Sequence, residues 1–443
     1  MPEVEVEILS SPTAAILEEK IRTRRARVGI VGLGYVGLPL AVEFAKAGFS
    51  VTGIDVSEEK TAMVNAGKSY IGDIASSMLA PLVESGKLRA TTDFSAVLEL
   101  DTINICVPTP LRKTKDPDMS FIVSACQEIA RHFHAGTLVI LESTTYPGTT
   151  DELVLPILAK GGLQVGRDFF LCFSPERVDP GNPKYQTVNI PKVVGGCTDD
   201  CTRVGQLFYE QALETVVPVS STQVAEMVKL LENTFRMINI GLANEMALMC
   251  DRMGINVWEV IDAAATKPFG FMPFYPGPGL GGHCIPIDPF YLSWKTKQAG
   301  IEARFIELAG YINGQMPHFV VDKVQNALND AGKPVKGSKI LVMGVAYKRD
   351  IEDMRESPAL DVMMLLQRRG GIVSYCDPHV PMVRLDGLNL QSVALETAAD
   401  ADCVVIITDH KAFDYRLLVE KAALIVDSRN ALKGVVSPKI VRL

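Results

Sequence analysis

The sequence predicts an α/β fold in which two parallel-sheet domains flank a helical domain. The chain has 443 residues, too many for one hydrophobic core. Short apolar runs that stop at glycine, proline or small polar residues lie toward both ends, as strands of a parallel sheet do. Between them, apolar residues recur at three- and four-residue steps, which indicates helices. We therefore expect an N-terminal Rossmann domain, a central helical domain and a C-terminal Rossmann-like domain.

The N-terminal domain is expected to cover residues 27–220, after an extension of residues 1–26. The run "RVGIV" at residues 27–31 predicts a strand, "GLGYVG" a glycine turn, the residues through Ala47 a helix, and "GFSVTGID" a second strand. Further strands are predicted in "DTINICVPTP", "GTLVILESTT" and "FFLCFSP". Each of these runs ends in a loop that a parallel sheet presents at its carboxyl edge.

The central domain, residues 221–331, is expected to be helical. A helix of about thirty residues from Ser221 to about Gly254 would be about 45 Å long and offer a surface for dimerisation. Its apolar positions are Val224, Met227, Val228, Leu231, Phe235, Ile238 and Leu242. The helical pattern continues through "VWEVIDAAA", breaks at the Pro/Gly-rich residues 268–289 and resumes from Tyr291 to about Ala331.

The C-terminal domain, residues 332–443, is expected to repeat the first βαβ pattern. After the linker "GKPVKGSK", strands are predicted in "KILVMGVAY", "GGIVSYCDP", "ADCVVIITD" and "ALIVDSR". The second strand of each series closes on an aspartate, Asp55 in the first and Asp377 in the other.

Composition excludes several classes of protein. A formal net charge of −8 argues against a nucleic-acid binder, and the cluster "KIRTRRAR" is best explained as a solvated helix end. No apolar run reaches the ~20 residues that span a bilayer, and the N-terminus lacks the pattern of a signal peptide. The nine cysteines show no metal-ligand spacing. We expect a cytoplasmic protein with free thiols and no metal site.

The strongest motif is "GLGYVG", in which Gly32, Gly34 and Gly37 follow a strand and open a helix. This context predicts a dinucleotide site, with Tyr35 and Val36 among the contacts. Asp55, 23 residues after Gly32, is expected to bind the adenosine ribose and to favour NAD over NADP. Lys60 either touches the ribose or lies in solvent.

Hydroxyl groups follow two other strands of this domain. Pro108 and Thr109 lie in "VPTP", and Ser143 and Thr144 lie in "LESTT". Such hydroxyls usually bond within their own loops. Because both motifs end parallel strands, we expect contacts to the nicotinamide or to ordered water.

Charged residues occur in a later loop and on the long helix. Glu176, Arg177 and Asp179 lie in "SPERVDPGNP", either in a solvated loop or in one shaped to hold them. Lys229 and Asn233 are four apart, on one helix face with apolar neighbours, so we expect partial enclosure. A partly buried lysine can stabilise a developing oxyanion.

Cys284 lies in "GPGLGGHCIPIDPFYL", between glycines and prolines. A structural cysteine is usually buried in a strand or helix, as Cys106, Cys172, Cys250 and Cys403 are expected to be. Cys284 instead has the access that a thiolate nucleophile needs, with Asp288 four residues on. His283 could lower the thiol pKa, although adjacent side chains often point apart.

Cations are concentrated after the first strand of the C-terminal domain. In "GVAYKRDIEDMRES", Lys348 and Arg355 stand in place of glycines. This loop suits a diphosphate bound through cations. For Arg355 alone, a charged helix start is also a reasonable explanation.

Taken together, these motifs resemble the UDP-glucose/GDP-mannose dehydrogenase family, the nucleotide-sugar 6-dehydrogenases, from Arg27 to about Arg429. "SPERVDPGN" and "GGHCIPIDPFYL" are most similar to the branch that acts on UDP-N-acetylhexosamines, with UDP-N-acetylglucosamine as the expected substrate. The alternatives are UDP-N-acetylgalactosamine, UDP-N-acetylmannosamine and UDP-glucose.

The resemblance implies NAD on the first domain, a UDP-sugar substrate, and a homodimer or higher homo-oligomer. It implies that Cys284 is the nucleophile, that Lys229, Asn233 and Asp288 polarise the intermediate and order water, and that Glu176 serves thioester hydrolysis. The implied substrate contacts are Glu176, Arg177, Lys229, Asn233, Lys348, Arg429 and the loop with Tyr275, Gly279 and Gly281, and Arg355 is an implied cofactor contact. Pro180 stands where the UDP-glucose enzymes have a second glutamate.

The implied chemistry is a four-electron oxidation of the sugar C6 hydroxyl by two NAD. Cys284 captures the intermediate aldehyde as a thiohemiacetal, which becomes a thioester that water hydrolyses. The alternatives are a two-electron dehydrogenase of the 6-phosphogluconate or hydroxyacyl type and a non-catalytic NAD-binding regulator.

Overall fold

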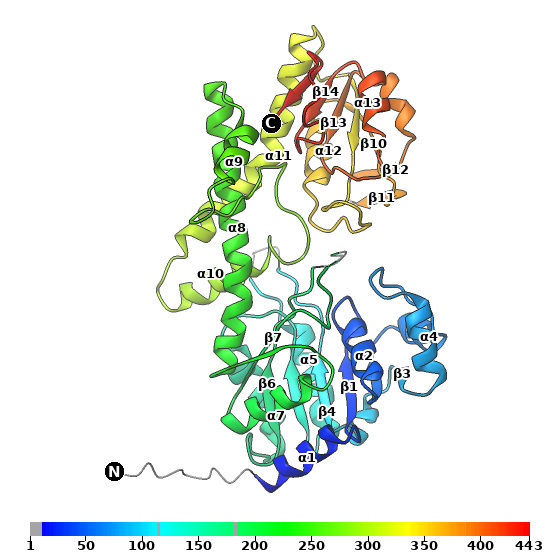
Figure 1. Ribbon diagram of the computed structural model, residues 1–443, viewed down its shortest axis with the longest axis vertical. Helices are drawn as coiled ribbons and strands as arrows, with labels where there is room; N and C mark the ends of the chain where they lie inside the picture. The colour runs from blue at the N-terminus through cyan, green and yellow to red at the C-terminus, as the bar shows by residue number, and fades with distance from the viewer. Residues whose placement is uncertain (1–10, 113–115, 180–181, 183, 386) are drawn as a thin grey trace. The chain divides into compact units, whose positions relative to one another are not determined.

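The computed structural model describes residues 11–112, 116–179, 182, 184–385 and 387–443. It divides into two compact units, Met1–Glu232 and Asn233–Leu443. The division falls within helix α8 (Thr222–Met253), so this helix supplies residues to both units (Figure 1). The expectation that the N-terminus is not a signal peptide falls partly on residues 1–10, which lie outside the described part.

The described part of the first unit contains a sheet with the order β3-β2-β1-β4-β5-β6-β7-β8. Its strands are β1 (Arg27–Val31), β2 (Ser50–Ile54), β3 (Leu88–Thr91), β4 (Thr102–Ile105), β5 (Leu138–Leu141), β6 (Phe170–Phe173), β7 (Lys192–Gly196) and β8 (Val216–Val219). Neighbouring strands are parallel except β6 and β7. The chain leaves β1 toward β3 and then returns to β4, so the carboxyl ends of β1 and β4 form the switch point where such sheets bind ligands.

Helices cover both faces of this sheet (Figure 1). They are α1 (Pro12–Arg22), α2 (Gly37–Lys46), α3 (Glu58–Asn65), α4 (Ser76–Glu84), α5 (Ser120–His132), α6 (Leu155–Leu158) and α7 (Asp199–Tyr209), with the short turns η1 (Phe94–Glu99), η2 (Thr150–Val154) and η3 (Ala159–Gly161). Phe44 of α2 stacks on Phe208 of α7 in one core, and α5 belongs to the other. Leu138 and Ile140 face the first core while Val139 faces the second, the two-residue alternation of a sheet buried on both sides.

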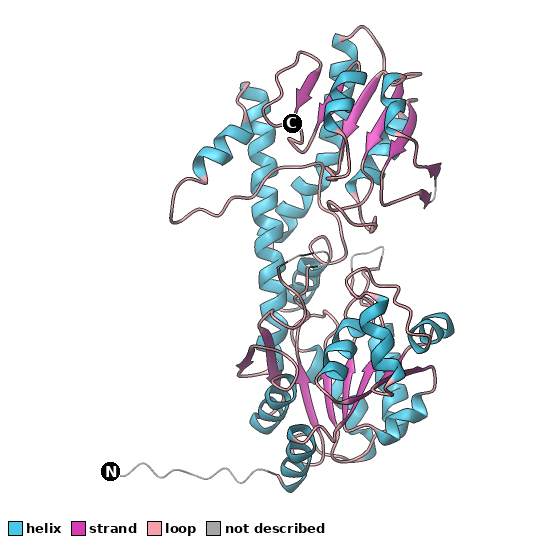
Figure 2. Ribbon diagram, turned by 45° about the vertical axis from the view of Figure 1, so that its right-hand side comes forward, coloured by secondary structure: helices cyan, strands magenta, loops and turns pink. Residues whose placement is uncertain are grey.

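The second unit combines helices with a smaller parallel sheet (Figure 2). The helices are the remainder of α8, α9 (Val257–Ala264), α10 (Asp288–Gln298), α11 (Arg304–Asp330), α12 (Pro358–Arg368) and α13 (Tyr415–Lys421), with the short turn η4 (Leu395–Ala399). The sheet order is β10 (Ile372–Cys376), β9 (Lys339–Met343), β13 (Cys403–Ile406), β14 (Ile425–Asp427) and β15 (Ile440–Arg442), and β11 (Met382–Leu385) pairs with β12 (Leu388–Gln391). The predicted α/β class, with helices between two parallel sheets in the chain, is confirmed.

Two predicted boundaries are wrong. Helix α10 begins at Asp288 rather than Tyr291, because Pro289 is accommodated in a first helical turn, where its missing N–H costs nothing. Arg355 does not open a helix, since α12 begins at Pro358. The first correction places Asp288 at a helix start instead of in the loop, and the second places Arg355 in a loop instead of at a helix start.

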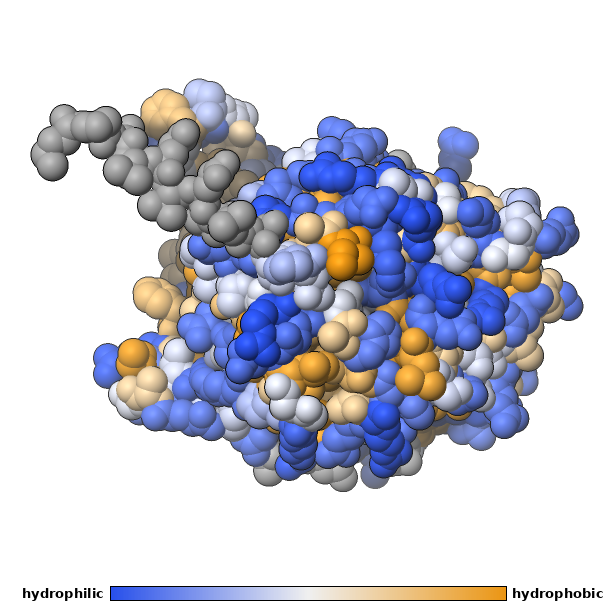
Figure 3. Space-filling model, turned by 90° about the horizontal axis from the view of Figure 1, so that it is seen from below, coloured by the Kyte–Doolittle hydropathy of each residue, from blue (hydrophilic) through white to orange (hydrophobic). Residues whose placement is uncertain are grey.

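No described helix is both long enough and apolar enough to cross a membrane. The face seen in Figure 3 is mainly hydrophilic, with apolar residues scattered among polar ones. Scattered apolar residues are normal on a protein surface and do not by themselves mark a binding site.

Candidate active site

The glycine turn after β1 is built for close approach. Gly32 has φ +92°, and a Cβ there would lie 2.6 Å from the carbonyl oxygen of Cys106, beyond β4. A Cβ on Gly37, at the start of α2, would lie 1.9 Å from the oxygen of Gly32. Around Gly34, by contrast, nothing lies within 4 Å of that position. Two glycines therefore close the turn, and the third leaves open space beside a helix N-terminus, which fits the diphosphate of a dinucleotide.

Asp55, at the end of β2, is buried and points toward this turn. Its Oδ2 accepts a hydrogen bond from Leu33 N at 2.8 Å, and its Oδ1 accepts one from Ser57 N at 3.0 Å. The ammonium of Lys60 lies 3.6 Å from Oδ2 while its side chain stays partly exposed. Lys60 therefore lies next to Asp55 and keeps part of its side chain in solvent.

The other predicted cofactor contacts differ in exposure. Tyr35 and Pro108 are exposed, Val36 is half-buried at the position just before α2, Thr109 is buried, and Thr144 is half-buried. Ser143 Oγ donates to the carbonyl oxygen of Val107 at 2.7 Å. This bond joins the loops after β4 and β5, so the Ser143 hydroxyl stabilises the loops themselves.

The loop after β6 is shaped by its own hydrogen bonds. Glu176 Oε1 accepts from the backbone N–H groups of Arg177 and Val178, each at 2.7 Å. The Arg177 guanidinium pairs with Glu232 of α8, with Nη2 and Oε1 2.5 Å apart. Asp179 Oδ2 accepts from Asn182 Nδ2 at 3.2 Å. Pro180, the departure from the UDP-glucose pattern, lies outside the described residues.

Lys229 is buried on α8, with 7% of its surface exposed. Its ammonium donates to the backbone carbonyl oxygen of Glu176. The predicted enclosure of this lysine is confirmed, and the bond brings the helix to the glutamate loop within the first unit. A cation kept from water in this way acts more strongly on nearby charge than one at the surface.

In the second unit, Asn233 and Asp288 form a buried pair. Asn233 Nδ2 donates to Asp288 Oδ2 at 2.6 Å, and Asp288 is 1% exposed. The half-buried Cys284 lies one turn earlier, and its carbonyl oxygen accepts from Ile287 N at 3.1 Å and Asp288 N at 2.8 Å. Cys284 thus opens the turn that leads into α10. The partial positive charge at a helix N-terminus favours the thiolate form of a cysteine.

The glycines before Cys284 pack against the loop between β9 and α12. A Cβ on Gly281 would lie 2.6 Å from Tyr347 Cβ, and one on Gly279 would lie 3.0 Å from Pro358 Cβ. Gly282 N donates to the carbonyl oxygen of Arg355 at 2.9 Å. Larger residues at these positions would force the two loops apart.

Tyr275, at the start of the same loop, is partly exposed. Its hydroxyl donates to Asp262 Oδ1 at 2.9 Å, and its ring stacks on Trp258 with the centroids 6.1 Å apart. These contacts hold Tyr275 against α9.

The predicted phosphate-binding cations are differently partnered. The Arg355 guanidinium pairs with Asp353, with Nη2 and Oδ2 2.6 Å apart, and Lys348 is half-buried. Arg429 Nε donates to the carbonyl oxygen of Ile407 at 2.8 Å, and its guanidinium lies against Gly277. Burial, followed by the charge of Arg349, lowers the pKa of Arg429 to about 10. A bound anion would relieve both costs.

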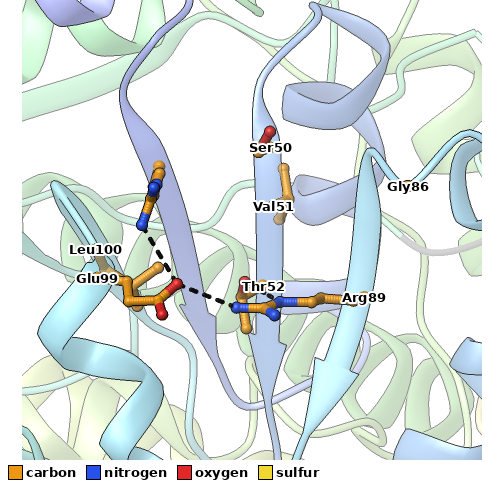
Figure 4. Close-up of a pocket in the computed structure, with 8 residues that line it drawn as sticks. Ser50, Val51, Thr52, Gly86, Arg89, Glu99 and Leu100 are labelled. Carbon is orange, nitrogen blue, oxygen red and sulfur yellow. Dashed lines mark hydrogen bonds and ion pairs between the residues drawn. The ribbon is translucent and has the colours of Figure 1, made fainter.

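A pocket in the first unit lies away from these residues. Ser50, Val51 and Thr52 line it from the first half of β2, and Glu99 lies between Arg27 and Arg89 there (Figure 4). It therefore opens at the amino ends of β1 and β2, opposite the glycine turn.

Comparison with known proteins identifies the chain. Residues 26–213 match the NAD binding domain of the UDP-glucose/GDP-mannose dehydrogenase family, residues 223–315 its central domain and residues 341–434 its UDP binding domain. The chain belongs to this family. It is therefore an NAD-dependent nucleotide-sugar dehydrogenase, and the glycine turn lies within the matched NAD binding domain.

Several similar proteins of this dehydrogenase family have names that specify an N-acetylated sugar. The UDP-N-acetyl-D-mannosamine dehydrogenase of Salmonella typhimurium is 36% identical over 403 residues, covering 87% of this chain and 94% of that protein. The NDP-N-acetyl-D-galactosaminuronic acid dehydrogenase of Ralstonia nicotianae is 36% identical, covering 87% and 91%. The solved UDP-D-ManNAc dehydrogenase of Pyrococcus horikoshii has a TM-score of 0.86 at 33% identity, covering 94% and 98%.

Sequence reasoning missed a buried polar network in the first unit of this dehydrogenase. Lys192 of β7 pairs with Glu142, which follows β5 and also accepts from Tyr209 and Asn104. Glu142 lies inside the motif "LESTT", but only the hydroxyl groups of the neighbouring Ser143 and Thr144 were assigned a role from the sequence. No pattern marked Lys192, because its partner is 50 positions away and is reached only through the order of the strands.

Glu226 was also missed. This buried residue of α8 accepts from Gly148 N and, at 2.9 Å, from Thr150 N in the loop after β5. Burial raises its pKa to about 7, against the opposing effect of these hydrogen bonds. Glu226 fixes the start of α8 to the edge of the sheet that carries Ser143.

Proposed function

We propose that this dehydrogenase oxidises the C6 hydroxyl of a UDP-N-acetylhexosamine to the carboxylate, with a covalent intermediate on Cys284. The observation that carries the proposal is the arrangement at the start of α10. A half-buried thiol begins the helical turn, and one turn later a buried carboxylate is held by an asparagine. A reactive thiolate next to a group that can orient water is what aldehyde capture and thioester hydrolysis require.

The proposal assigns one role to each side chain. NAD held at the glycine turn and beside Asp55 would supply the hydride acceptor for each of the two oxidations. The Cys284 thiolate adds to the C6 aldehyde, and the Lys229 ammonium stabilises the oxyanion that forms. Asp288, kept in place by Asn233, orients the water that hydrolyses the thioester, and Glu176 assists that step.

The cations of the second unit support a UDP-sugar as the substrate. Arg429 keeps its guanidinium among backbone groups, with the charge of Arg349 nearby, and the half-buried Lys348 follows β9 in the same unit. A diphosphate would offset the unfavourable charge of Arg349 at Arg429, and arginine can bind it through two parallel hydrogen bonds. We propose Arg429 and Lys348 as substrate contacts and Arg355 as a contact to the cofactor.

The identity of the sugar can be narrowed by two observations. The loop motifs favour UDP-N-acetylglucosamine, and the names of the similar proteins favour UDP-N-acetylmannosamine. Incubation of the purified enzyme with NAD and each of four UDP-sugars, the N-acetylated glucosamine, mannosamine and galactosamine forms and UDP-glucose, distinguishes them. We expect fastest turnover with an N-acetylated sugar and two NADH per sugar consumed, measured by absorbance and by quantifying the acid.

Other outcomes of that panel would contradict the proposal. One NADH per sugar would indicate a two-electron dehydrogenase without a thioester. No NADH with any of the four sugars would favour the NAD-binding regulator. Fastest turnover with UDP-glucose would remove the N-acetyl specificity while keeping the four-electron chemistry.

We further propose a homodimer formed through α8. Apolar side chains of this helix are exposed at three-, four- and seven-residue steps, among them Leu231 at 63% and Leu242 at 55%. A stripe of this kind on a long helix suits a second copy of the same helix. Sedimentation velocity should show a dimer that the double variant Leu231→Asp/Leu242→Asp converts to monomer. Ile16→Asp, which changes an equally exposed residue of α1, should stay dimeric. A monomeric wild-type protein would refute the dimer.

The domain division and the location of the enzyme also stand as proposals. We propose domains at residues 27–220, 221–331 and 332–443, which follow the order of the three family matches. All nine cysteines are described and none forms a disulfide. Free thiols support work in a reducing compartment such as the cytoplasm.

A further inference from the structure

The carboxylate of Glu176 is held by contacts on both of its oxygens. Oε1 accepts the two backbone hydrogen bonds of the glutamate loop, and Oε2 lies 3.5 Å from the ammonium of Lys192. The backbone oxygen of the same residue accepts from Lys229. Glu176 therefore has two cations nearby, one at its carboxylate and one at its carbonyl group.

Lys192 is itself held in place by an ion pair with Glu142. Its surface is 5% exposed, and its ammonium lies 2.5 Å from Glu142 Oε2. The other oxygen of Glu142 accepts from the Tyr209 hydroxyl at 2.5 Å and from Asn104 Nδ2 at 2.7 Å. The Tyr209 ring lies beneath the ammonium, 5.4 Å from its centroid. A charge buried this deeply is tolerated only when its polar surroundings are placed well. Here strand β4 supplies Asn104, the residue after β5 is Glu142, and helix α7 supplies Tyr209.

We propose that Lys192, anchored by Glu142, is a positioning residue that keeps the Glu176 carboxylate ionised and correctly oriented for hydrolysis of the thioester. This inference rests on the proposed function. Glu142 is the counter-ion that allows a lysine to remain charged in this interior. Lys192 carries the effect of that buried pair to the loop that takes part in the reaction.

The charges around Glu176 support this role. Burial raises the pKa of Glu176, but attraction to Lys192, the hydrogen bond from Val178 N and attraction to Lys229 outweigh it, so the pKa lies below the usual value. Burial likewise lowers the pKa of Lys192, and the negative charges of Glu142 and then Glu176 more than restore it. Arg177, the next residue of the loop, is ion-paired with Glu232. Tyr209 and Cys106 also lie close to Lys192, and burial raises the pKa of each, so both stay neutral.

The step that this arrangement serves is balanced without any further reagent. The oxygen of a water molecule bonds to the acyl carbon of the sugar, and the carbon–sulfur bond breaks with its electron pair moving to Sγ of Cys284. As the carbon–oxygen bond forms, one proton of the water passes to the ionised Glu176 carboxylate and from there to the Cys284 thiolate or to solvent. The other proton stays on the new carboxyl group and is lost to solvent when that acid ionises.

Replacing Lys192 with methionine removes the cation that lowers the pKa of Glu176, whereas burial continues to raise that pKa. The acidic limb of the pH profile for thioester hydrolysis is expected to move up by about 1–3 pH units, the range for loss of a nearby opposite charge. At a pH between the acidic limbs of the two proteins the acyl-enzyme should then accumulate, seen as a mass increase on Cys284 by intact-protein mass spectrometry and as a burst of two NADH per active site. UDP-N-acetylmannosamine and UDP-N-acetylglucosamine serve as the substrates.

Two further variants separate this role from a merely structural one. Lys192→Met/Glu142→Gln removes the whole ion pair, so no unpaired carboxylate destabilises the fold, and we expect the shifted limb to persist. Lys192→Arg keeps the cation and should keep the wild-type limb. Lys20→Met, which removes the ion pair with Asp101 near the amino end of β4, is the control for loss of a lysine in the same unit.

The outcomes are distinguishable. A wild-type enzyme that releases only one NADH per sugar overturns the proposed function and this inference with it. A wild type that releases two, beside a double variant whose acidic limb coincides with that of the wild type, overturns the inference alone. A shifted limb in both methionine variants but not in Lys192→Arg supports it.

Discussion

Replacing Cys284 with serine is expected to lower the rate of uronic acid formation by at least about 10³-fold while leaving NAD binding unchanged. The thiol begins the helical turn before α10, where the helix N-terminus favours a thiolate. A serine hydroxyl keeps the size of the side chain but is not ionised in this environment. The aldehyde is then not captured, and the second oxidation lacks its covalent intermediate. The acid is measured by mass spectrometry, and NAD binding by titration of the protein's fluorescence.

Cys197→Ser is the matched control for this prediction. Cys197 and Cys284 are both half-buried, while the other described cysteines are buried. Cys197 Sγ donates to Asp151 Oδ1 at 3.1 Å, a bond that a serine hydroxyl can replace. We expect this variant to retain turnover. Acid formation by Cys284→Ser at a rate near that of the wild type is the result that excludes the thioester route.

Local signals were enough to predict the parts of the molecule that a few adjacent residues determine. The turn at Gly32, Gly34 and Gly37 is such a part, because the glycine spacing, the strand before it and the helix after it all lie within twenty residues. The long helix was predicted to within one residue at each end, since its apolar stripe continues over eight turns. Cys106, Cys172, Cys250 and Cys403 are buried, as their apolar surroundings indicated.

Features that depend on strand order could not be predicted in the same way. Strand β7 carries Lys192 and pairs antiparallel with β6, whereas the other neighbouring strands of that sheet are parallel. Its sequence is short and ends in two glycines, and the following β8 contains Pro218, so neither run was recognised as a strand. Without those strands, nothing connected Lys192 to Glu142 or to Glu176. Glu176 and Lys229 were therefore singled out from the sequence, but Lys192 and Glu142 were not.

Replacing Lys229 with methionine is expected to reduce kcat by about 10²–10³-fold, the range for removing one preorganised group that stabilises an oxyanion. The methionine side chain occupies a similar volume, so the packing of α8 should be retained. In the wild-type protein the Lys229 ammonium is buried and hydrogen-bonded to the glutamate loop, so it does not behave as an ordinary surface charge. Because its proposed role is to stabilise charge that develops only during reaction, the loss should fall on kcat rather than on KM.

The measurement should be made at pH 9, because Lys229 also lowers the pKa of Glu176 and a change at neutral pH would mix the two effects. At that pH the carboxylate is ionised in both proteins, and the remaining difference reports on the oxyanion. Arg252→Met removes an exposed cation from the last turn of the same helix and should leave kcat unchanged. A Lys229→Met enzyme with normal kcat and a raised KM would show that this lysine only binds substrate. Stabilisation of the oxyanion would then fall to the backbone N–H groups at the start of α10, which follow Cys284 directly in the sequence.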